Sequence, residues 1–254
     1  MQSQYERLTD GQWEIIKKFL NYQRKRSLEL RKVVDAILFV SRTGIQWRNL
    51  KETNFPHWQA VYYYFSKWTK SGIWNKMNAE LIKMERVENQ REEKPSVFIV
   101  DSQSIKLAPM IYEHRGIDGF KKINGRKRQI ITDVTGRIYG SIVHSANIHD
   151  SVVSTSFLTI IQSYQKRLKK ILADHAYQGD FSKIVEENQV KFEVPKREEG
   201  QKGFVVEAKR WVVERSFAWL NFFRRTTLDY EHTPESAQSF VLIANISMCL
   251  SKFK

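Results

Sequence analysis

The chain has 254 residues, of which 41% are hydrophobic and 13% aromatic. These proportions exclude a disordered chain and suit a globular protein of one large or two modest domains. The single cysteine, Cys249, excludes an internal disulfide and a cysteine-based zinc site. No apolar run approaches the roughly 20 residues that span a bilayer. The first residues are polar and lack a signal-peptide core, so we expect no membrane partner and a cytoplasmic, nucleoid-associated protein.

The formal net charge is +14, from 42 Lys and Arg against 28 Asp and Glu side chains. Both parts contribute, with 18 basic and 11 acidic side chains in residues 1–94 and 24 and 17 in residues 95–254. A surface of this kind attracts phosphate backbones because binding releases counterions. The charge favours a nucleic-acid partner, with an ordinary basic protein as the alternative.

Residues 1–88 carry helical signals only. Thr9-Asp10-Gly11-Gln12 reads as a capping box that opens a first helix. Ser27 is placed to cap a second helix that Gly44 ends, and Pro56 suits the start of a third. A fourth is expected from Ile73 to about Val87. We predict a small all-helical, helix-turn-helix-like DNA-binding domain, with phosphate contacts from two lysines of the third helix, Lys67 and Lys70.

Residues 89–95 are polar and read as a linker. Residues 96–254 then predict an α/β domain: a strand at 97–101, a basic loop, a hairpin around Asp133–Gly136, and two further strands separated by helices. That order describes a mixed sheet with flanking helices. A last helix is expected to end near Leu220.

Three acidic residues stand in apolar surroundings. Asp101 follows Val97–Val100, Asp174 follows Ile171–Ala173, and Glu214 lies within Trp211–Leu220. Ligand sites collect at strand ends in such sheets, and buried carboxylates need a compensating cation. Oxygen ligands of this type suit Mg²⁺ or Mn²⁺, and two such ions support phosphoryl transfer. The alternative for Glu214 is a simple ion pair with Arg210 or Arg215.

Basic residues gather between the first two predicted strands and near the last helix. A solvated charged loop is the alternative to a DNA contact. The candidates for DNA binding here are Lys106, Lys121, Lys122, Arg126, Lys127, Arg128, Arg210, Arg215, Arg224 and Arg225.

Other acidic residues have structural explanations. Asp133 is expected in a hairpin turn, Asp150 and Asp180 as helix caps, and Asp118 in a polar loop. His175 follows Asp174 and is expected to be exposed, although it is placed to assist there.

Several segments resemble the IS5 group of the IS4-like superfamily of DDE transposases, found in bacterial insertion sequences. The segments that carry the resemblance are Val100–Lys106, Asp118–Arg128, Ala146–Ser151, Ala173–Gly179 and Trp211–Leu220, after an N-terminal helical part that includes Trp47–Leu50 and Trp74–Met77. Their order along the chain is more specific than any one of them.

The resemblance implies an RNase H-like catalytic fold in which Asp101, Asp174 and Glu214 form the catalytic triad and bind two Mg²⁺ or Mn²⁺ ions. It implies binding to the terminal inverted repeats of the protein's own element, DNA cleavage, and strand transfer to target DNA. Two element ends must be brought together, so a homodimer or larger assembly on double-stranded DNA is expected.

One departure from the superfamily concerns the pattern Tyr-x2-Arg-x3-Glu-x6-Lys around the third carboxylate. Arg210 and Glu214 match, but Glu207 and Asn221 stand at the Tyr and Lys positions. A DNA-hairpin step is therefore left open. Two other functions also remain: a DNA nuclease without strand joining, and a non-catalytic DNA-binding regulator.

Overall fold

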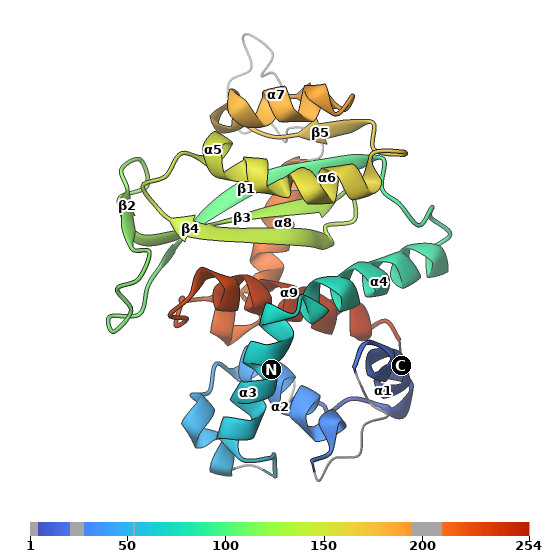
Figure 1. Ribbon diagram of the computed structural model, residues 1–254, viewed down its shortest axis with the longest axis vertical. Coiled ribbons are helices and arrows are strands. Elements are labelled where there is room, and N and C mark those ends of the chain that lie inside the picture. The colour runs from blue at the N-terminus through green and yellow to red at the C-terminus, as the bar shows by residue number, and fades with distance from the viewer. Residues whose placement is uncertain (1–4, 21–27, 53, 195–209, 254) are drawn as a thin grey trace.

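The computed structural model describes residues 5–20, 28–52, 54–194 and 210–253. Its first part is helical (Figure 1). The helices are α1 (Asp10–Ile16), η1 (Lys17–Phe19), α2 (Leu30–Thr43), η2 (Trp47–Glu52), α3 (Trp58–Lys70) and α4 (Ile73–Glu88).

Two of the predicted helix signals lie at these helix ends. The capping box at Thr9 and Gln12 is present, since each side chain accepts the other's backbone N–H. Gly44 ends α2 with φ 72°, a left-handed conformation that glycine adopts without strain. The predicted cap Ser27 lies outside the described residues. Pro56 precedes α3 by two residues, so that His57 is the N-cap.

Six strands of the described chain form one sheet, and they are β1 (Val97–Lys106), β2 (Gly116–Asp118), β3 (Ile123–Asp133), β4 (Ile138–Ser145), β5 (Lys170–Leu172) and β6 (Lys191–Glu193). β3 pairs antiparallel with β1 and with β4, whereas β1, β5 and β6 run parallel. The mixed sheet is confirmed. The order β4-β3-β1-β5-β6 is the RNase H-like arrangement that the resemblance implies.

The sheet extends further than the sequence indicated. β1 continues five residues past Asp101, and the segment predicted as a basic loop holds β2 and the first part of β3. β2 pairs with the N-terminal end of β3, next to β4. The polar sequence concealed these strands, because their charged side chains do not alternate with apolar ones as a half-buried strand does.

Helices cover both faces of the sheet (Figure 1). One face holds α5 (Asp150–Ser154), η3 (Thr155–Phe157), α6 (Leu158–Tyr164) and α7 (Asp180–Glu187), and α8 (Arg210–Leu220) packs on the other. The helical segment after β4 is thus interrupted at 155–157, and α7 begins at Asp180, one of the two predicted caps. Short one-turn helices η4 (His175–Tyr177) and η5 (Arg224–Thr226) follow β5 and α8.

The helix α9 (Pro234–Leu250) was not predicted from the sequence. α9 lies between the sheet and the N-terminal helices, and it contacts α2, α3, α4 and β4 (Figure 1). A helix buried on most sides lacks the one-sided apolar period by which helices are recognised. No helix in the described ranges combines the length and apolar character needed to cross a bilayer.

Because of α9, the core is continuous across the predicted linker. One buried cluster contains Phe65 of α3, Phe98 of β1 and Phe240 of α9, and the rings of Phe65 and Phe240 stack with centroids 4.8 Å apart. The division into residues 1–88, 89–95 and 96–254 stays a prediction.

Buried polar contacts join α4 to the β3–β4 turn. Arg86 of α4 forms an ion pair with Asp133, which is fully buried and also accepts the backbone N–H of Thr135 at 2.9 Å. Arg137 pairs with Glu85 of α4 at 2.6 Å. These bonds fix the helical part against the sheet, since a buried charge that loses its partner is costly.

We predict that Arg86→Ala lowers the free energy of unfolding by about 3–5 kcal/mol, because Asp133 is left buried without its cation. Urea denaturation measures this change. The matched control is Lys83→Ala on the same helix, whose pair with Glu93 is exposed and which costs less than about 1 kcal/mol. Equal losses for the two variants would contradict the structural role given to Arg86.

Candidate active site

Asp101 and Asp174 lie at the same level on neighbouring parallel strands. Ile99 of β1 is opposite Leu172 of β5, and each aspartate follows two residues later. Both side chains are half-buried. The backbone N–H of Ser102 donates to Asp101 Oδ1 at 2.7 Å, and that of Ala176 donates to Asp174 Oδ1 at 2.9 Å. The structure therefore brings these two predicted residues to the same level. Asp174 follows the end of β5 as predicted, whereas Asp101 lies within β1 and not at its end.

Glu214 lies on the helix that covers the same face. Ile99 and Asp101 share a face because side chains alternate along a strand, and Ile99 is buried with Val213 and Phe217 of α8. The burial expected for Glu214 from its apolar neighbours is wrong, because Glu214 is exposed, as are Trp211 and Ala218. The argument from a costly buried charge does not apply to Glu214.

The three predicted carboxylates are not gathered into a cage. Among the residues that the structure describes, no three His, Cys, Asp or Glu side chains lie close enough to hold a metal ion. The assignment of Glu214 beside Asp101 and Asp174 stays a prediction. Its possible partner Arg215 is directed elsewhere: the guanidinium stacks on Trp211 and Trp219 at 4.5 and 4.7 Å and donates to the Thr135 carbonyl at 3.0 Å. The Arg210 side chain lies outside the described part.

Asp150 is a buried carboxylate next to the aspartate pair, and the sequence reading took it for a helix cap. The N-cap of α5 is instead His149, whose Nδ1 accepts the Ser151 N–H at 3.3 Å. Asp150 accepts the Ser102 hydroxyl at 3.1 Å and pairs with Lys127 Nζ at 3.4 Å. Ser102, the residue after Asp101, thus connects Asp150 to β1. A charge pair between a strand and a helix 23 residues later has no local sequence signal, so only the fold reveals it.

Asp180, like Asp150, was predicted to cap a helix and lies one residue past the cap. It is the first residue of α7, after the N-cap Gly179, and it is exposed.

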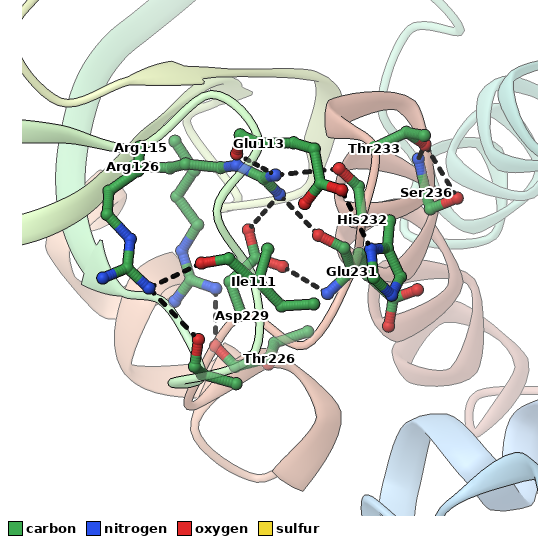
Figure 2. Close-up of polar contacts among 12 residues, drawn as sticks. Ile111, Glu113, Arg115, Arg126, Thr226, Asp229, Glu231, His232, Thr233 and Ser236 are labelled. Carbon is green, nitrogen blue, oxygen red and sulfur yellow. Dashed lines mark hydrogen bonds and ion pairs between the residues drawn. The ribbon is translucent and has the colours of Figure 1, made fainter.

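Three arginines predicted to bind DNA are buried, and for them the prediction is corrected. Figure 2 shows the Arg126 guanidinium enclosed by Asp229 at 3.0 Å and by the carbonyls of Glu113, Glu231 and His232. Arg126 is 0% exposed. A side chain enclosed in this way holds the segment 229–232 against β3 and offers no accessible donor to a phosphate.

Arg128 and Arg225 are also turned inward. Arg128 donates to the Gln103 side chain and to the Thr226 carbonyl, and burial lowers the pKa of its guanidinium to about 10. Arg225 pairs with Glu231 at 2.6 Å. Asp229 and Thr226 lie about a hundred residues after Arg126 and Arg128 in the sequence, so these contacts could not be recognised from the charge pattern alone.

The other basic candidates have donors at the surface. Lys127 is an intermediate case, mostly buried beside Asp150. The exposed ones are Lys67 and Lys70 on α3, Lys106 at the end of β1, Lys121 and Lys122 between β2 and β3, and Arg224 after α8.

Comparisons with known proteins agree with this arrangement. Residues 8–78 match the family described as a putative transposase of the IS4/5 family. Residues 92–250, more than half of the chain, match the family described as the transposase DDE domain. The chain belongs to the DDE transposase family.

Two individual proteins are similar to this transposase. It is 25% identical over 133 residues to a putative transposase for insertion sequence element IS402 from Burkholderia cepacia. That match covers 49% of this chain and 63% of the relative, less than two thirds of its length. Superposed on the Mos1 transposase paired-end complex with left transposon end, the chain has a TM-score of 0.29 and 9% identity, with 92% and 83% of the two chains covered. That score is too low to add to the fold assignment.

Tyr177 is buried near the three aspartates Asp101, Asp150 and Asp174. Its hydroxyl is fully enclosed and makes no hydrogen bond of ordinary geometry with the described residues, although Ser102 lies beside it. Burial, followed by the charges of Asp101, Asp150 and Asp174, raises the pKa of the phenol well above its ordinary value. Tyr177 is therefore a neutral donor beside three carboxylates.

The residues at this edge suit a hard divalent cation. Asp101 and Asp174 are oxygen donors open to solvent on one side, and Tyr177 has an unused buried hydroxyl. Mg²⁺ is commonly held by one or two carboxylates together with waters and substrate phosphates. This donor set fits Mg²⁺ or Mn²⁺ better than the softer metals.

We predict that Tyr177→Phe raises the free energy of unfolding by about 1 kcal/mol, because it removes a buried hydroxyl without a partner. The matched control is Tyr139→Phe, whose hydroxyl donates to Asp133 at 3.4 Å and whose loss costs about 1 kcal/mol. Thermal unfolding of both variants without added metal measures the difference. Equal destabilisation would mean that Ser102 is a true partner of Tyr177.

Proposed function

We propose that this transposase binds the terminal inverted repeats of its own insertion sequence and performs DNA cleavage and strand transfer with Mg²⁺ or Mn²⁺. The observation that carries the proposal is the alignment of Asp101 and Asp174 on adjacent parallel strands, in a chain whose residues 92–250 match the DDE family. We also propose a cytoplasmic, nucleoid-associated location and a homodimer or larger assembly on DNA.

In this proposal Asp101 and Asp174 hold the cations from the sheet, and Glu214 contributes from α8. Two cations bound there would stabilise the attacking and leaving oxygens of a phosphoryl transfer. The backbone N–H groups of Ser102 and Ala176 orient the Asp101 and Asp174 carboxylates by hydrogen bonds. Asp150 holds the Lys127 ammonium near the same edge, where positive charge favours an approaching phosphate.

The DNA would follow two groups of exposed lysines. Lys106 is the last residue of β1, the strand that continues past Asp101, and Lys121 and Lys122 lie between β2 and β3. Lys67 and Lys70 lie on α3 beside the exposed rings of Tyr62 and Tyr63, and these residues line a common open groove. Lysines interleaved with exposed aromatic rings are suited to contact both phosphates and bases.

We predict that Asp101→Asn and Asp174→Asn each lower cleavage of DNA carrying the element's ends by at least about a thousandfold, because charge stabilisation is the main catalytic contribution. Glu214→Gln is expected to have a comparable effect. Binding to the same DNA, measured by gel shift, is expected to persist. Asp180→Asn, an exposed acidic residue on α7, is the control and keeps full activity.

The products of this assay separate the proposal from its alternatives. Joining of cleaved ends to a target plasmid supports a transposase. Cleavage without joined products would instead identify a nuclease. Full cleavage by Asp101→Asn would reject this site, and DNA binding without any cleavage by the wild type would identify a regulator.

A second prediction concerns α3. The double variant Lys67→Ala, Lys70→Ala is expected to reduce the slope of log affinity against log salt by about 2, since each lost phosphate contact removes close to one unit. Titrations at several salt concentrations measure the slope. Lys76→Ala, an exposed lysine on α4, is the control and leaves the slope unchanged. An unchanged slope in the double variant would remove α3 from the DNA interface.

A further inference from the structure

The hairpin between β2 and β3 carries a fully displayed aromatic ring. Phe120 is 95% exposed, the highest value among the large hydrophobic residues of the described chain. A phenylalanine ring that is exposed to solvent does not gain the free energy that its burial would provide. A single exposed apolar residue is ordinary on a protein surface, so the support beneath the ring is what gives it meaning.

The tip of the hairpin is held rigidly. The Asp118 carboxylate is buried and accepts the backbone N–H groups of Phe120 and Lys121, both at 3.0 Å. The Ser104 hydroxyl of β1 also donates to Asp118. Burial opposes ionisation of Asp118, yet these hydrogen bonds prevail and its pKa is lowered. An ionised, buried carboxylate thus fixes the backbone that presents the ring.

The charges around the ring indicate its partner. Lys121 and Lys122 follow Phe120 directly and are exposed, and Lys106 is exposed at the end of β1 nearby. An apolar protein partner would have to desolvate these ammonium groups, which is costly. Nucleic acid offers phosphates to the lysines and flat bases to the ring at the same time.

The position of the hairpin is consistent with a contact away from the cleavage site. Asp101 pairs with Ile130 of β3, and the strand runs from there to Ile123 before it reaches the tip. Seven residues at about 3.3 Å each span about 23 Å. A duplex lying along the sheet would pass the tip several base pairs from the aspartates.

We propose that Phe120 stacks on a DNA base that is unpaired or unstacked, with Lys121 and Lys122 holding the adjacent phosphates. The proposal rests on the proposed function only in that DNA is the partner. An apolar ring inserted at a distorted step is a known way to stabilise bent or opened duplexes. The ring would then favour DNA that is already distorted, or distort it on binding.

The test compares the affinity of the full chain for two short duplexes that differ by one bulged adenine. Wild type is expected to bind the bulged duplex more tightly. In Phe120→Ala the ratio of the two affinities is expected to fall about tenfold, in the range measured when a stacking aromatic residue is replaced. Phe120→Trp is expected to keep the wild-type ratio. With 2-aminopurine as the bulged base, fluorescence should fall on binding to wild type and to Phe120→Trp but not to Phe120→Ala.

Two controls separate stacking from charge and from general exposure. Tyr112→Ala removes another exposed ring, from the segment before β2, and should keep the preference. Lys121→Ala should weaken binding to both duplexes alike, and it lowers the salt slope by about 1.

An unchanged preference in Phe120→Ala would overturn the proposal. The proposal would also be overturned if Phe120→Ala changed the oligomeric state in sedimentation while the preference for the bulged duplex stayed the same. That result would assign the ring to a contact between copies of the chain. Because neither measurement involves cleavage, the outcome is independent of the fate of the catalytic assignment.

Discussion

The ion pair between Arg86 and Asp133 is the contact on which the arrangement of this transposase depends. Asp133 lies at the turn between β3 and β4, and Arg86 lies near the end of α4, the last helix of the N-terminal helical part. Asn78 of α4 and Asn245 of α9 add a buried link, because Asn245 donates to Asn78 at 2.7 Å and Asn78 to the Ile138 carbonyl at 2.8 Å. Buried polar contacts of this kind are satisfied in one geometry only. The lysines of α3 are thereby held in a set position relative to the aspartates of the sheet.

A second constraint is strand register. Asp101 and Asp174 lie at the same level because Ile99 is opposite Leu172 and each aspartate follows two residues later. Side chains alternate between the two faces along each strand, so both carboxylates are on the same face. A shift by one residue would turn one carboxylate to the face of α5 and α7. Buried Ile99 and Leu172 on one face and Phe98 and Ile171 on the other prevent that shift. The chemistry of the edge is therefore fixed by the packing beneath it.

Local signals allowed much of the fold to be predicted. The Thr9 capping box, the Gly44 helix end, α7 and the β3–β4 turn all depend on neighbours within a few residues, and each was found. The two aspartates were recognised because each ends an apolar run.

What escaped prediction depends on distant partners. Arg126 resembles a phosphate ligand in sequence, but Asp229, 103 residues later, encloses it. Glu214 was expected to be buried because its neighbours are apolar, yet it faces outward between them. Asp150, the first residue of α5, contacts Ser102 of β1 and Lys127 of β3, which are distant in the sequence. The helix α9 has no polar face to mark it, since it is surrounded by both parts of the molecule.

The position of α9 in the chain also has a kinetic consequence. Residues 234–250 complete the cluster that contains Phe65 and Leu38 of the helical part, so that part cannot close its core while the chain is being synthesised up to that point. Contacts between segments so far apart slow folding and leave apolar surface open for longer. A protein built in this way completes the core of its helical part only after almost all of the described sequence has emerged from the ribosome, and a product that stops before α9 would leave that core open.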